Sequence, residues 1–381
     1  MSPNSLPVVD MHCHVGLVGD RWPQWGVMSD EYRRELAFKI FLLYARVAED
    51  QVSDQGLRAK VIEAIAGSGL DKVVCLALDP VYTESGRRKE SASHFWVDND
   101  YILELQKDLP GRILLGASVH PYDQEFESRV RKYVDKGTVL IKWLPSAQQI
   151  DLASERALRA MKFLATAGPG GRALPLLLHT GPEYAIPTSD KRTQSYDFLT
   201  WSWRDDFGNF FRPRGKKWRR IDVKRIRGNL EAALNEGADI IFAHSGLPYF
   251  SGGILGGLLE HSEFKTVKEF LERTERGEFK GRCFADLSAI ATPFRKKYFS
   301  DLRKLPQDLL LYGSDFPTPA FELSADLDEI INDFKAVMTG QLYRVVVPQD
   351  NLLDVNLREL RHAFPESPVF TNFARHGFVR D

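Results

Sequence analysis

The chain has 381 residues, of which 43% are hydrophobic and 27% charged, and its formal net charge is −1 at pH 7. This balance is that of an ordinary globular protein with enough apolar residues for a large core. The near-zero charge argues against a protein that binds nucleic acid through its overall charge. No apolar run approaches the length of a membrane span, and no basic and then apolar leader precedes the first predicted strand. We therefore expect no membrane contact and no secretory signal.

The three cysteines, Cys13, Cys75 and Cys283, lie far apart in the chain and form no CxxC pair. This spacing argues against a disulfide framework or a structural zinc finger, and it fits a reducing cytoplasm. We expect a cytoplasmic protein whose partner is a small-molecule substrate. Assembly into a homo-oligomer is left open.

The first predicted strand, residues 8–14 (VVDMHCH), carries two histidines. Side chains two residues apart point to the same face of a strand, so His12 and His14 project together and Cys13 turns the other way. Two imidazoles that converge at a strand end can share one metal ion, because imidazole is a common metal ligand. A pair of hydrogen-bonded structural histidines is the alternative.

Seven further apolar segments have the character of buried strands. They cover residues 71–78, 112–119, 138–144, 174–178, 239–243, 282–287 and 309–312. Helices are predicted over residues 30–48, 58–66, 99–107, 125–135, 154–165, 223–235, 264–273, 294–305 and 325–338, and one or two short closing helices after Pro348.

Continuously hydrophobic strands that alternate with helices form parallel sheets, and eight of them make a (β/α)8 TIM barrel. We therefore predict the α/β class, with one domain over residues 1–381 and loop insertions after the first, second and fifth strands. A doubly wound open sheet is the rival fold. No GxGxxG phosphate-binding turn follows any strand, which disfavours that rival.

Polar side chains gather where the predicted strands end, which in such a barrel is where the active site lies. Five of the nine histidines take these positions: His12, His14, His120, His179 and His244. Lys142 and Asp315 lie at the ends of the fourth and eighth strands. Neutral imidazoles and a carboxylate that meet at one rim are what a metal centre requires.

Five motifs in a fixed order carry a family resemblance. They are DMHCH at 10–14, IKWLP at 141–145, LHTG at 178–181, FAHSG at 242–246 and GSDFP at 313–317, and TNFA at 371–374 adds a closing segment. With these motifs the chain resembles the amidohydrolase superfamily of metal-dependent barrel enzymes. More narrowly, it is similar to the amidohydrolase-2 branch, which includes the aminocarboxymuconate-semialdehyde decarboxylase-like enzymes.

The resemblance implies a metal centre with four protein ligands, His12, His14, His179 and Asp315. It also implies that His244 is a catalytic histidine near the ion. One Zn²⁺ ion is expected, and Mn²⁺ or another divalent ion is not excluded. Lys142 is either a partner for a substrate or protein carboxylate, or a carbamylated ligand that bridges to a second ion.

The expected activity is that of a metal-dependent hydrolase, which attacks an amide, ester or lactone with a metal-activated water. Asp315 would take the proton of this water, and His244 would polarise the substrate carbonyl or position the water. The alternative is a lyase, a nonoxidative decarboxylase of a small aromatic or unsaturated acid. A remote alternative is a barrel scaffold without catalysis.

Three further features have more than one interpretation. The basic, Trp-rich segment 201–227 is a lid for an anionic substrate, a subunit contact or a solvated surface loop. His120 is either a site residue or a cap on the third strand. Asp10 is expected to hydrogen-bond behind the metal ligands and not to bind the ion.

Overall fold

The computed structural model describes residues 6–48, 51–180, 185–187, 222–247, 263–292, 295–318, 320, 332 and 350–379. Eight parallel strands form one sheet in chain order, and each predicted strand contains one of them. The strands are β1 (Val9–His14), β3 (Lys72–Leu76), β5 (Ile113–Ala117), β6 (Leu140–Trp143), β7 (Leu176–Leu178), β8 (Ile240–Phe242), β9 (Cys283–Asp286) and β10 (Leu310–Leu311). The predicted α/β barrel is confirmed.

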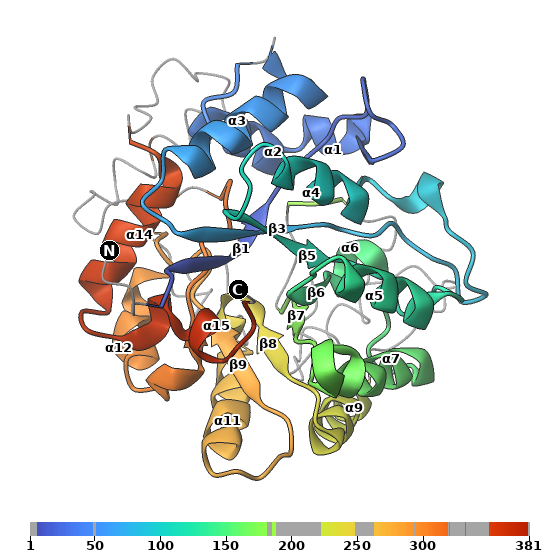
Figure 1. The fold of residues 1–381 in the computed structure, drawn as a ribbon, viewed down its shortest axis with the longest axis vertical. Helices are drawn as coiled ribbons and strands as arrows, with labels where there is room; N and C mark the ends of the chain where they lie inside the picture. The colour runs from blue at the N-terminus through green and yellow to red at the C-terminus, as the bar shows by residue number, and fades with distance from the viewer. Residues whose placement is uncertain are drawn as a thin grey trace.

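Backbone hydrogen bonds between the first and last strands bring the two edges of this sheet together. The amide of Met11 donates to the carbonyl of Tyr312 at 3.0 Å, and that of His14 donates to Phe316 at 2.8 Å. The amide of Asp315 donates in return to the carbonyl of His12 at 2.8 Å. Figure 1 shows the strands in the middle of the molecule with the helices around them. The carboxyl ends of β1 and β10 therefore lie side by side.

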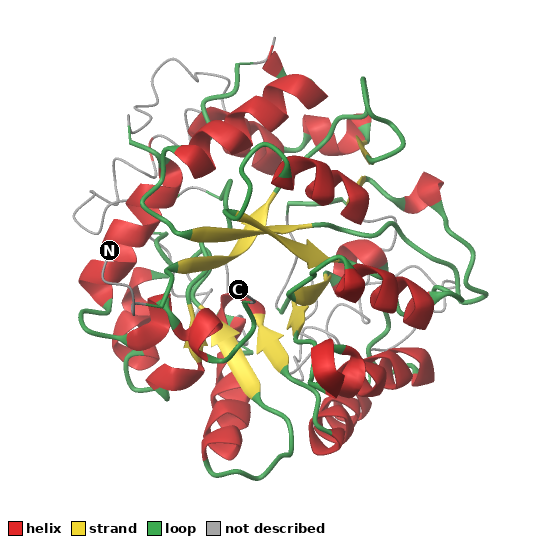
Figure 2. Cartoon of the chain, viewed as in Figure 1, coloured by secondary structure: helices red, strands yellow, loops and turns green. Residues whose placement is uncertain are grey.

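The longer helices cover the outside of the strands (Figure 2). They are α3 (Asp54–Ala66), α4 (Asn99–Gln106), α5 (Phe126–Asp135), α7 (Glu155–Ala167), α9 (Val223–Glu236), α11 (Phe264–Glu275) and α14 (Leu352–Ala363). Several begin at a side chain that accepts a hydrogen bond from the first turn, as Ser53 does from the amide of Gly56 and Ser154 from that of Ala157. Such caps satisfy backbone donors that have no partner inside the helix.

Two predicted helices differ from the structure, and a third lies outside the described residues. The helix predicted over residues 30–48 is two helices, α1 (Asp30–Arg34) and α2 (Leu36–Tyr44), because Glu35 between them is extended. The helix predicted over residues 294–305 shrinks to a 3-10 turn followed by α12 (Phe299–Leu302). The helix predicted over residues 325–338 lies outside the described residues except for position 332. The closing helices are confirmed by α14 and by α15 (Asn372–Arg375).

A small second sheet joins the loops that follow the first two barrel strands, and the sequence analysis did not predict it. Its strands β2 (Gly26–Met28) and β4 (Phe95–Val97) pair antiparallel. They belong to insertions that were expected after the first and second strands. Any side chain at Gly26 would place its Cβ 2.8 Å from the carbonyl oxygen of Trp96, so this close pairing requires glycine.

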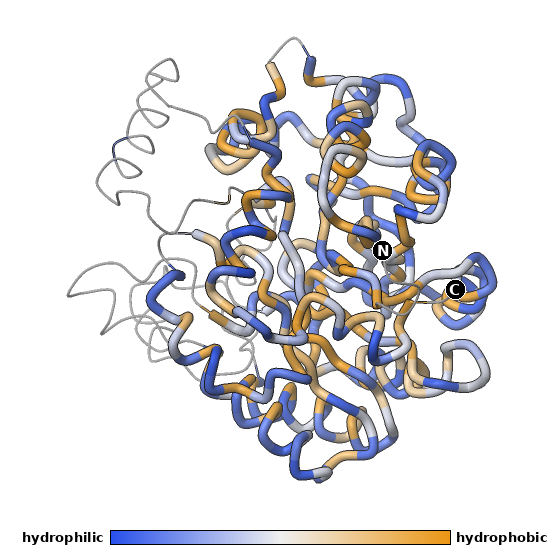
Figure 3. Tube along the Cα trace, turned by 60° about the vertical axis from the view of Figure 1, so that its left-hand side comes forward, coloured by the Kyte–Doolittle hydropathy of each residue, from blue (hydrophilic) through white to orange (hydrophobic). Residues whose placement is uncertain are grey.

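The core is continuous and apolar, and the barrel strands are buried on both faces. The hydropathy colouring of Figure 3 shows hydrophobic segments inside and hydrophilic ones outside. Within the described ranges, Leu6 is the exposed large hydrophobic residue. None of the described helices combines the length and apolar character that crossing a membrane demands. The insertion after the fifth strand, with most of segment 201–227, falls outside the described residues.

Candidate metal centre

Three donor atoms from the ends of β1 and β10 form a small triangle. The Nε2 atoms of His12 and His14 are 3.2 Å apart. The Oδ1 atom of Asp315 lies 3.4 Å from the first of these nitrogens and 3.3 Å from the second. A tetrahedral ion with bonds of about 2.0–2.1 Å holds its ligands about 3.3 Å apart. The triangle therefore has the dimensions of one face of a zinc site.

Backbone geometry holds Asp315 in this position. Its amide is bonded to the carbonyl of His12, and its φ of 62° lies in the left-handed region, which Asp tolerates better than most residues. The Thr318 hydroxyl donates to Oδ2 of Asp315 at 2.9 Å. This bond occupies one carboxylate oxygen and leaves Oδ1 toward the two imidazoles.

Burial keeps three of the site histidines, His14, His179 and His244, neutral at neutral pH. It lowers the pKa of His14 to about 4 and that of His244 to about 3. Burial also takes the pKa of His179 well below its usual range. Burial alone would raise the pKa of Asp315, but the nearby His244 and the hydrogen bond with His14 hold it well below its usual value. Neutral imidazoles and an ionised carboxylate are the forms that bind a metal ion.

The two histidines of the triangle differ in exposure. The side chain of His14 is 27% exposed, whereas that of His12 is fully buried.

Lys142 reaches the same centre from β6. It is fully buried, and its Nζ atom lies 3.3 Å from Nε2 of His12. The two roles expected from the sequence, partner for a carboxylate or carbamylated bridge to a second ion, are both compatible with this place.

His179 and His244 pair with each other. Nδ1 of His179 lies 3.3 Å from Nε2 of His244, with the two rings edge to face. Among the described residues, two groups of His, Cys, Asp and Glu bring single donor atoms within 4.8 Å of one another: His12, His14 and Asp315, and His12, His244 and Asp286. His179 belongs to neither group, so its role as a ligand stays a prediction.

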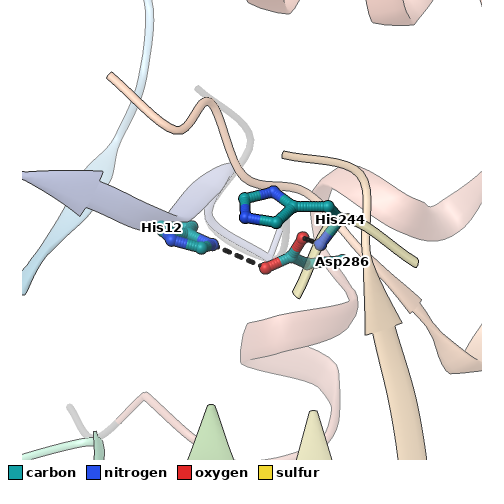
Figure 4. Close-up of side chains that lie close together, drawn as sticks. All are labelled: His12, His244 and Asp286. Atoms are coloured by element: carbon teal, nitrogen blue, oxygen red, sulfur yellow. Dashed lines mark hydrogen bonds and ion pairs between the residues drawn. The ribbon is translucent and has the colours of Figure 1, made fainter. Parts of the chain in front are cut away.

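Asp286 is the functional residue that the sequence analysis missed. Its Oδ2 accepts a hydrogen bond from Nδ1 of His12 at 2.7 Å, and its Oδ1 accepts one from the amide of His244 at 2.7 Å (Figure 4). Its position in the sequence resembles that of Asp315, because Asp286 is the last residue but one of the seventh predicted strand and Asp315 follows the eighth.

Asp10 supports the centre, whereas His120 lies apart from it. Oδ1 of Asp10 accepts from the amides of His12 and Ser314, which ties β1 to the end of β10 behind the metal ligands. Burial raises the pKa of Asp10 to about 6. His120 is fully buried, and its Nε2 bonds to the carbonyl of Gln148 at 2.9 Å. These contacts favour the structural interpretation of His120.

No protein-family model and no curated protein matches the chain. The fold does match solved structures. IDCase from Metarhizium anisopliae aligns with 98% of this chain and 95% of its own, at 13% identity and a TM-score of 0.50. A Pseudomonas putida protein assigned as a 2-pyrone-4,6-dicarboxylic acid hydrolase aligns with 94% of this chain and 98% of its own, at 16% identity and a TM-score of 0.42.

A third match is a 5-carboxyvanillate decarboxylase from Novosphingobium aromaticivorans that was complexed with manganese and a nitrobenzoic acid ligand. It aligns with 93% of this chain and 96% of its own, at 13% identity and a TM-score of 0.43. At these identities the matches show a shared barrel fold. The family resemblance predicted from the motifs is confirmed at the level of the fold, and the relatives include both hydrolases and decarboxylases.

Proposed function

We propose that this chain is a metal-dependent enzyme of the amidohydrolase-2 branch. The triangle of His12, His14 and Asp315 carries the proposal, because its edges of 3.2–3.4 Å fit the ligand spacing of a single ion. His179 completes the ligand set by the family resemblance. Its closeness to His244, which borders the same centre, supports that role.

Hydrolysis is the reaction that this arrangement supports best. A divalent ion held by these residues would supply a Lewis acid and would lower the pKa of a water from near 16 to roughly 7. The pKa of Asp315 lies well below its usual value, so its carboxylate can accept the proton of that water, while the hydroxyl of Thr318 holds Oδ2 in place. The ring of His244 lies 5.3 Å from that of His12, close enough to orient the carbonyl of a substrate held at the centre. The proposed substrate is a small molecule with an amide, ester or lactone bond.

Decarboxylation of a small aromatic or unsaturated acid is the second candidate. The names of two solved relatives, IDCase and 5-carboxyvanillate decarboxylase, favour it. In that reaction Asp315 or His244 would deliver the proton that replaces the lost carboxylate. The ligand set is the same for both reactions.

Metal content and product analysis test these proposals. The protein is to be purified from medium supplemented with zinc or manganese, and the bound ions are to be counted by mass spectrometry. One zinc ion per chain is the expected result, and two would point to a bridging role for Lys142. A chain that retains no ion from either medium favours the scaffold without catalysis.

Assays on lactones, esters, amides and carboxylic acids then separate the reactions. Acid release without carbon dioxide identifies the hydrolase, and carbon dioxide release identifies the decarboxylase. Asp315→Asn keeps the shape of the side chain but removes the charge that would bind the ion and accept the proton. It is expected to lower kcat by at least 100-fold for either reaction.

A further inference from the structure

The buried carboxylate of Asp286 contacts His12, which belongs to the triangle, and His244, which pairs with His179. Oδ2 takes the bond from Nδ1 of His12, and Oδ1 takes the bond from the amide of His244. Oδ1 also accepts from the amide of Ser288 at 3.1 Å and from its hydroxyl at 2.5 Å. The main-chain carbonyl of Asp286 accepts a bond from the hydroxyl of Ser245 at 2.7 Å.

The distances decide between a metal ligand and a hydrogen-bonding group. Two ligands of one tetrahedral ion stand about 3.3 Å apart. Asp286 and Nδ1 of His12 are 2.7 Å apart, which is the length of a charge-assisted N–H···O bond. The group of His12, His244 and Asp286 is therefore a hydrogen-bonded cluster, and His12, His14 and Asp315 are the residues that would hold an ion.

This bond sets the tautomer of His12. A carboxylate with an ordinary pKa near 3.9 is ionised at pH 8 and can only accept hydrogen bonds. Nδ1 of His12 must then carry the proton. A neutral imidazole has one N–H, so Nε2 keeps its lone pair, and Nε2 is the atom that faces His14 and Asp315.

Ser288 passes the same constraint to His244. The single hydroxyl proton of Ser288 is directed to the carboxylate of Asp286, so its oxygen accepts from Nδ1 of His244 at 2.8 Å. The carbonyl oxygen of Ser288, which can only accept, lies 3.3 Å from the same nitrogen. Both contacts require an N–H at Nδ1 of His244, and its Nε2 is then an acceptor.

The contact between His244 and His179 extends this hydrogen-bond network to a third histidine. Nε2 of His244 is 3.3 Å from Nδ1 of His179. Since Nε2 of His244 carries no proton, Nδ1 of His179 must donate. The lone pair of His179 then lies on its Nε2, the nitrogen that a metal ion would bind.

We propose that Asp286 is a positioning residue that sets the Nδ1–H tautomer of three histidines, His12 directly and His244 and His179 through Ser288. In this network the Nε2 atoms of His12 and His179 keep their lone pairs, with which they can bind a metal ion. Its consequence for the ion rests on the proposed function, but the tautomers themselves do not, because they are defined in the metal-free protein. Asp286 also braces the turn at His244 and Ser245, whose φ angles of 55° and 53° are left-handed.

Nuclear magnetic resonance of metal-free protein with ¹⁵N-labelled histidine tests the tautomers at pH 8. Long-range ¹H–¹⁵N correlations report which ring nitrogen carries the proton, and single His→Gln variants assign the signals. The native protein is expected to show the Nδ1–H pattern for His12, His179 and His244. Asp286→Ala is expected to shift His12 toward the Nε2–H form and to raise the zinc dissociation constant by about 10- to 100-fold, measured by competition with a chromophoric chelator.

Ser288→Ala separates the direct effect of Asp286 on His12 from its indirect effect on His244 and His179. Because it removes only a hydroxyl group, this variant tests the proposal even if Asp286→Ala does not fold. It is expected to mix the tautomers of His244 and His179 and to leave His12 unchanged. Asp239→Asn is the control, because this buried carboxylate pairs with Arg282 and stands just before β8, at the amino end of the barrel strands. It should change none of the three tautomers.

Two results would overturn the proposal. One is a folded Asp286→Ala protein with His12 still in the Nδ1–H form and the native zinc dissociation constant. The other is a native protein in which any of the three histidines carries its proton on Nε2. A failure of the proposed function would give a different result: the native protein would show the predicted tautomers but would not bind zinc.

Discussion

At the scale of single residues, the site depends on where a few nitrogen and oxygen atoms point. His12 and His14 share a strand face, and Asp315 joins them because β10 is bonded to β1. Gly313 allows this approach, since a Cβ at that position would lie 2.8 Å from Cβ of His12. A larger residue at position 313 would clash with His12, the fully buried histidine of the triangle. Small steric changes at this strand are therefore expected to affect metal binding.

His179→Ala is predicted to abolish metal retention while the fold survives. The barrel core is built from buried apolar side chains and does not depend on the ion. Metal content after purification and far-ultraviolet circular dichroism measure the two effects. His120→Gln is the matched control and should keep its metal, because His120 bonds to the carbonyl of Gln148 and not to the centre. Full metal occupancy in His179→Ala would remove His179 from the ligand set.

The neutral form of His120 makes the stability depend on pH. Burial lowers its pKa to about 4 in the folded protein, against about 6.5 in the unfolded chain. Between these values the unfolded state binds the extra proton, so the free energy of unfolding falls as the pH is lowered from 6.5 to 4. Above pH 6.5 this group adds no pH dependence. The total loss is on the order of 3 kcal/mol.

Urea titrations of metal-free protein at pH 7.5 and pH 5 measure this effect. His120→Gln keeps one donor and one acceptor but does not titrate. Its loss of stability between the two pH values is expected to be smaller than that of the native chain by on the order of 2 kcal/mol. The other buried histidines contribute equally to the loss of stability in both proteins, so their contribution cancels in the comparison. Equal losses in the two proteins would show that His120 is not held neutral.

At the scale of elements, one acidic side chain at the start of α3 orders the loop that follows β1. Asp54 is fully buried. Its carboxylate accepts four backbone amides at 2.7–3.0 Å, from Val18, Gly19, Arg21 and Trp22. A single carboxylate thereby satisfies the donors of a loop that lies at the rim of the site.

Asp54→Asn is predicted to lower the free energy of unfolding by about 3 kcal/mol, because the amide group can no longer accept on one side. Denaturant midpoints measure the loss. Hydrogen exchange at Val18, Gly19, Arg21 and Trp22 should quicken in the same variant. Gln55→Ala, on the exposed surface beside it, is the control and should cost less than about 0.5 kcal/mol. Slow exchange at those four amides in Asp54→Asn would contradict the role assigned to Asp54.

The barrel strands are the elements that local sequence predicts well. Each is a run of apolar residues between polar turns. Each observed strand lies inside its predicted range and is one to three residues shorter than that range. Strands β2 and β4 are different. They have three residues each and lie about 70 positions apart, so no periodicity marks them. The break at Glu35 is also invisible to the helical pattern, which continues across it.

At the scale of the whole molecule, the barrel is a frame that holds the site without needing the ion. Apolar side chains fill it from the strands outward to the helices. Binding of an ion to the folded state alone adds stability by mass action. The amount depends on the free ion concentration relative to its dissociation constant.

Removing the ion with a chelator is predicted to lower the free energy of unfolding by about 2.7 kcal/mol when zinc had been present at 100 times its dissociation constant. The far-ultraviolet spectrum should not change. His14→Ala is the control, because it removes one corner of the triangle, and its stability should be insensitive to zinc and chelator. A chain that unfolds on chelation would show instead that the ion is structural.

The sequence by itself determined the order of strands and helices, and with it the barrel, because hydrophobic runs and their spacing are local properties. It also placed His12, His14, His244 and Asp315 at strand ends, since each follows or closes an apolar run. Only the tertiary structure decided which of these atoms meet. The pairing of β10 with β1 spans about 300 residues, and it creates the triangle.

The same holds for Asp286, whose importance comes from contacts with His12 and His244 that no spacing in the chain reveals. Distances between side chains from different strands depend on barrel closure and on the direction of each ring. Both are collective results of packing. A linear pattern can therefore name the donors of a metal centre, but the geometry that orients them belongs to the folded molecule.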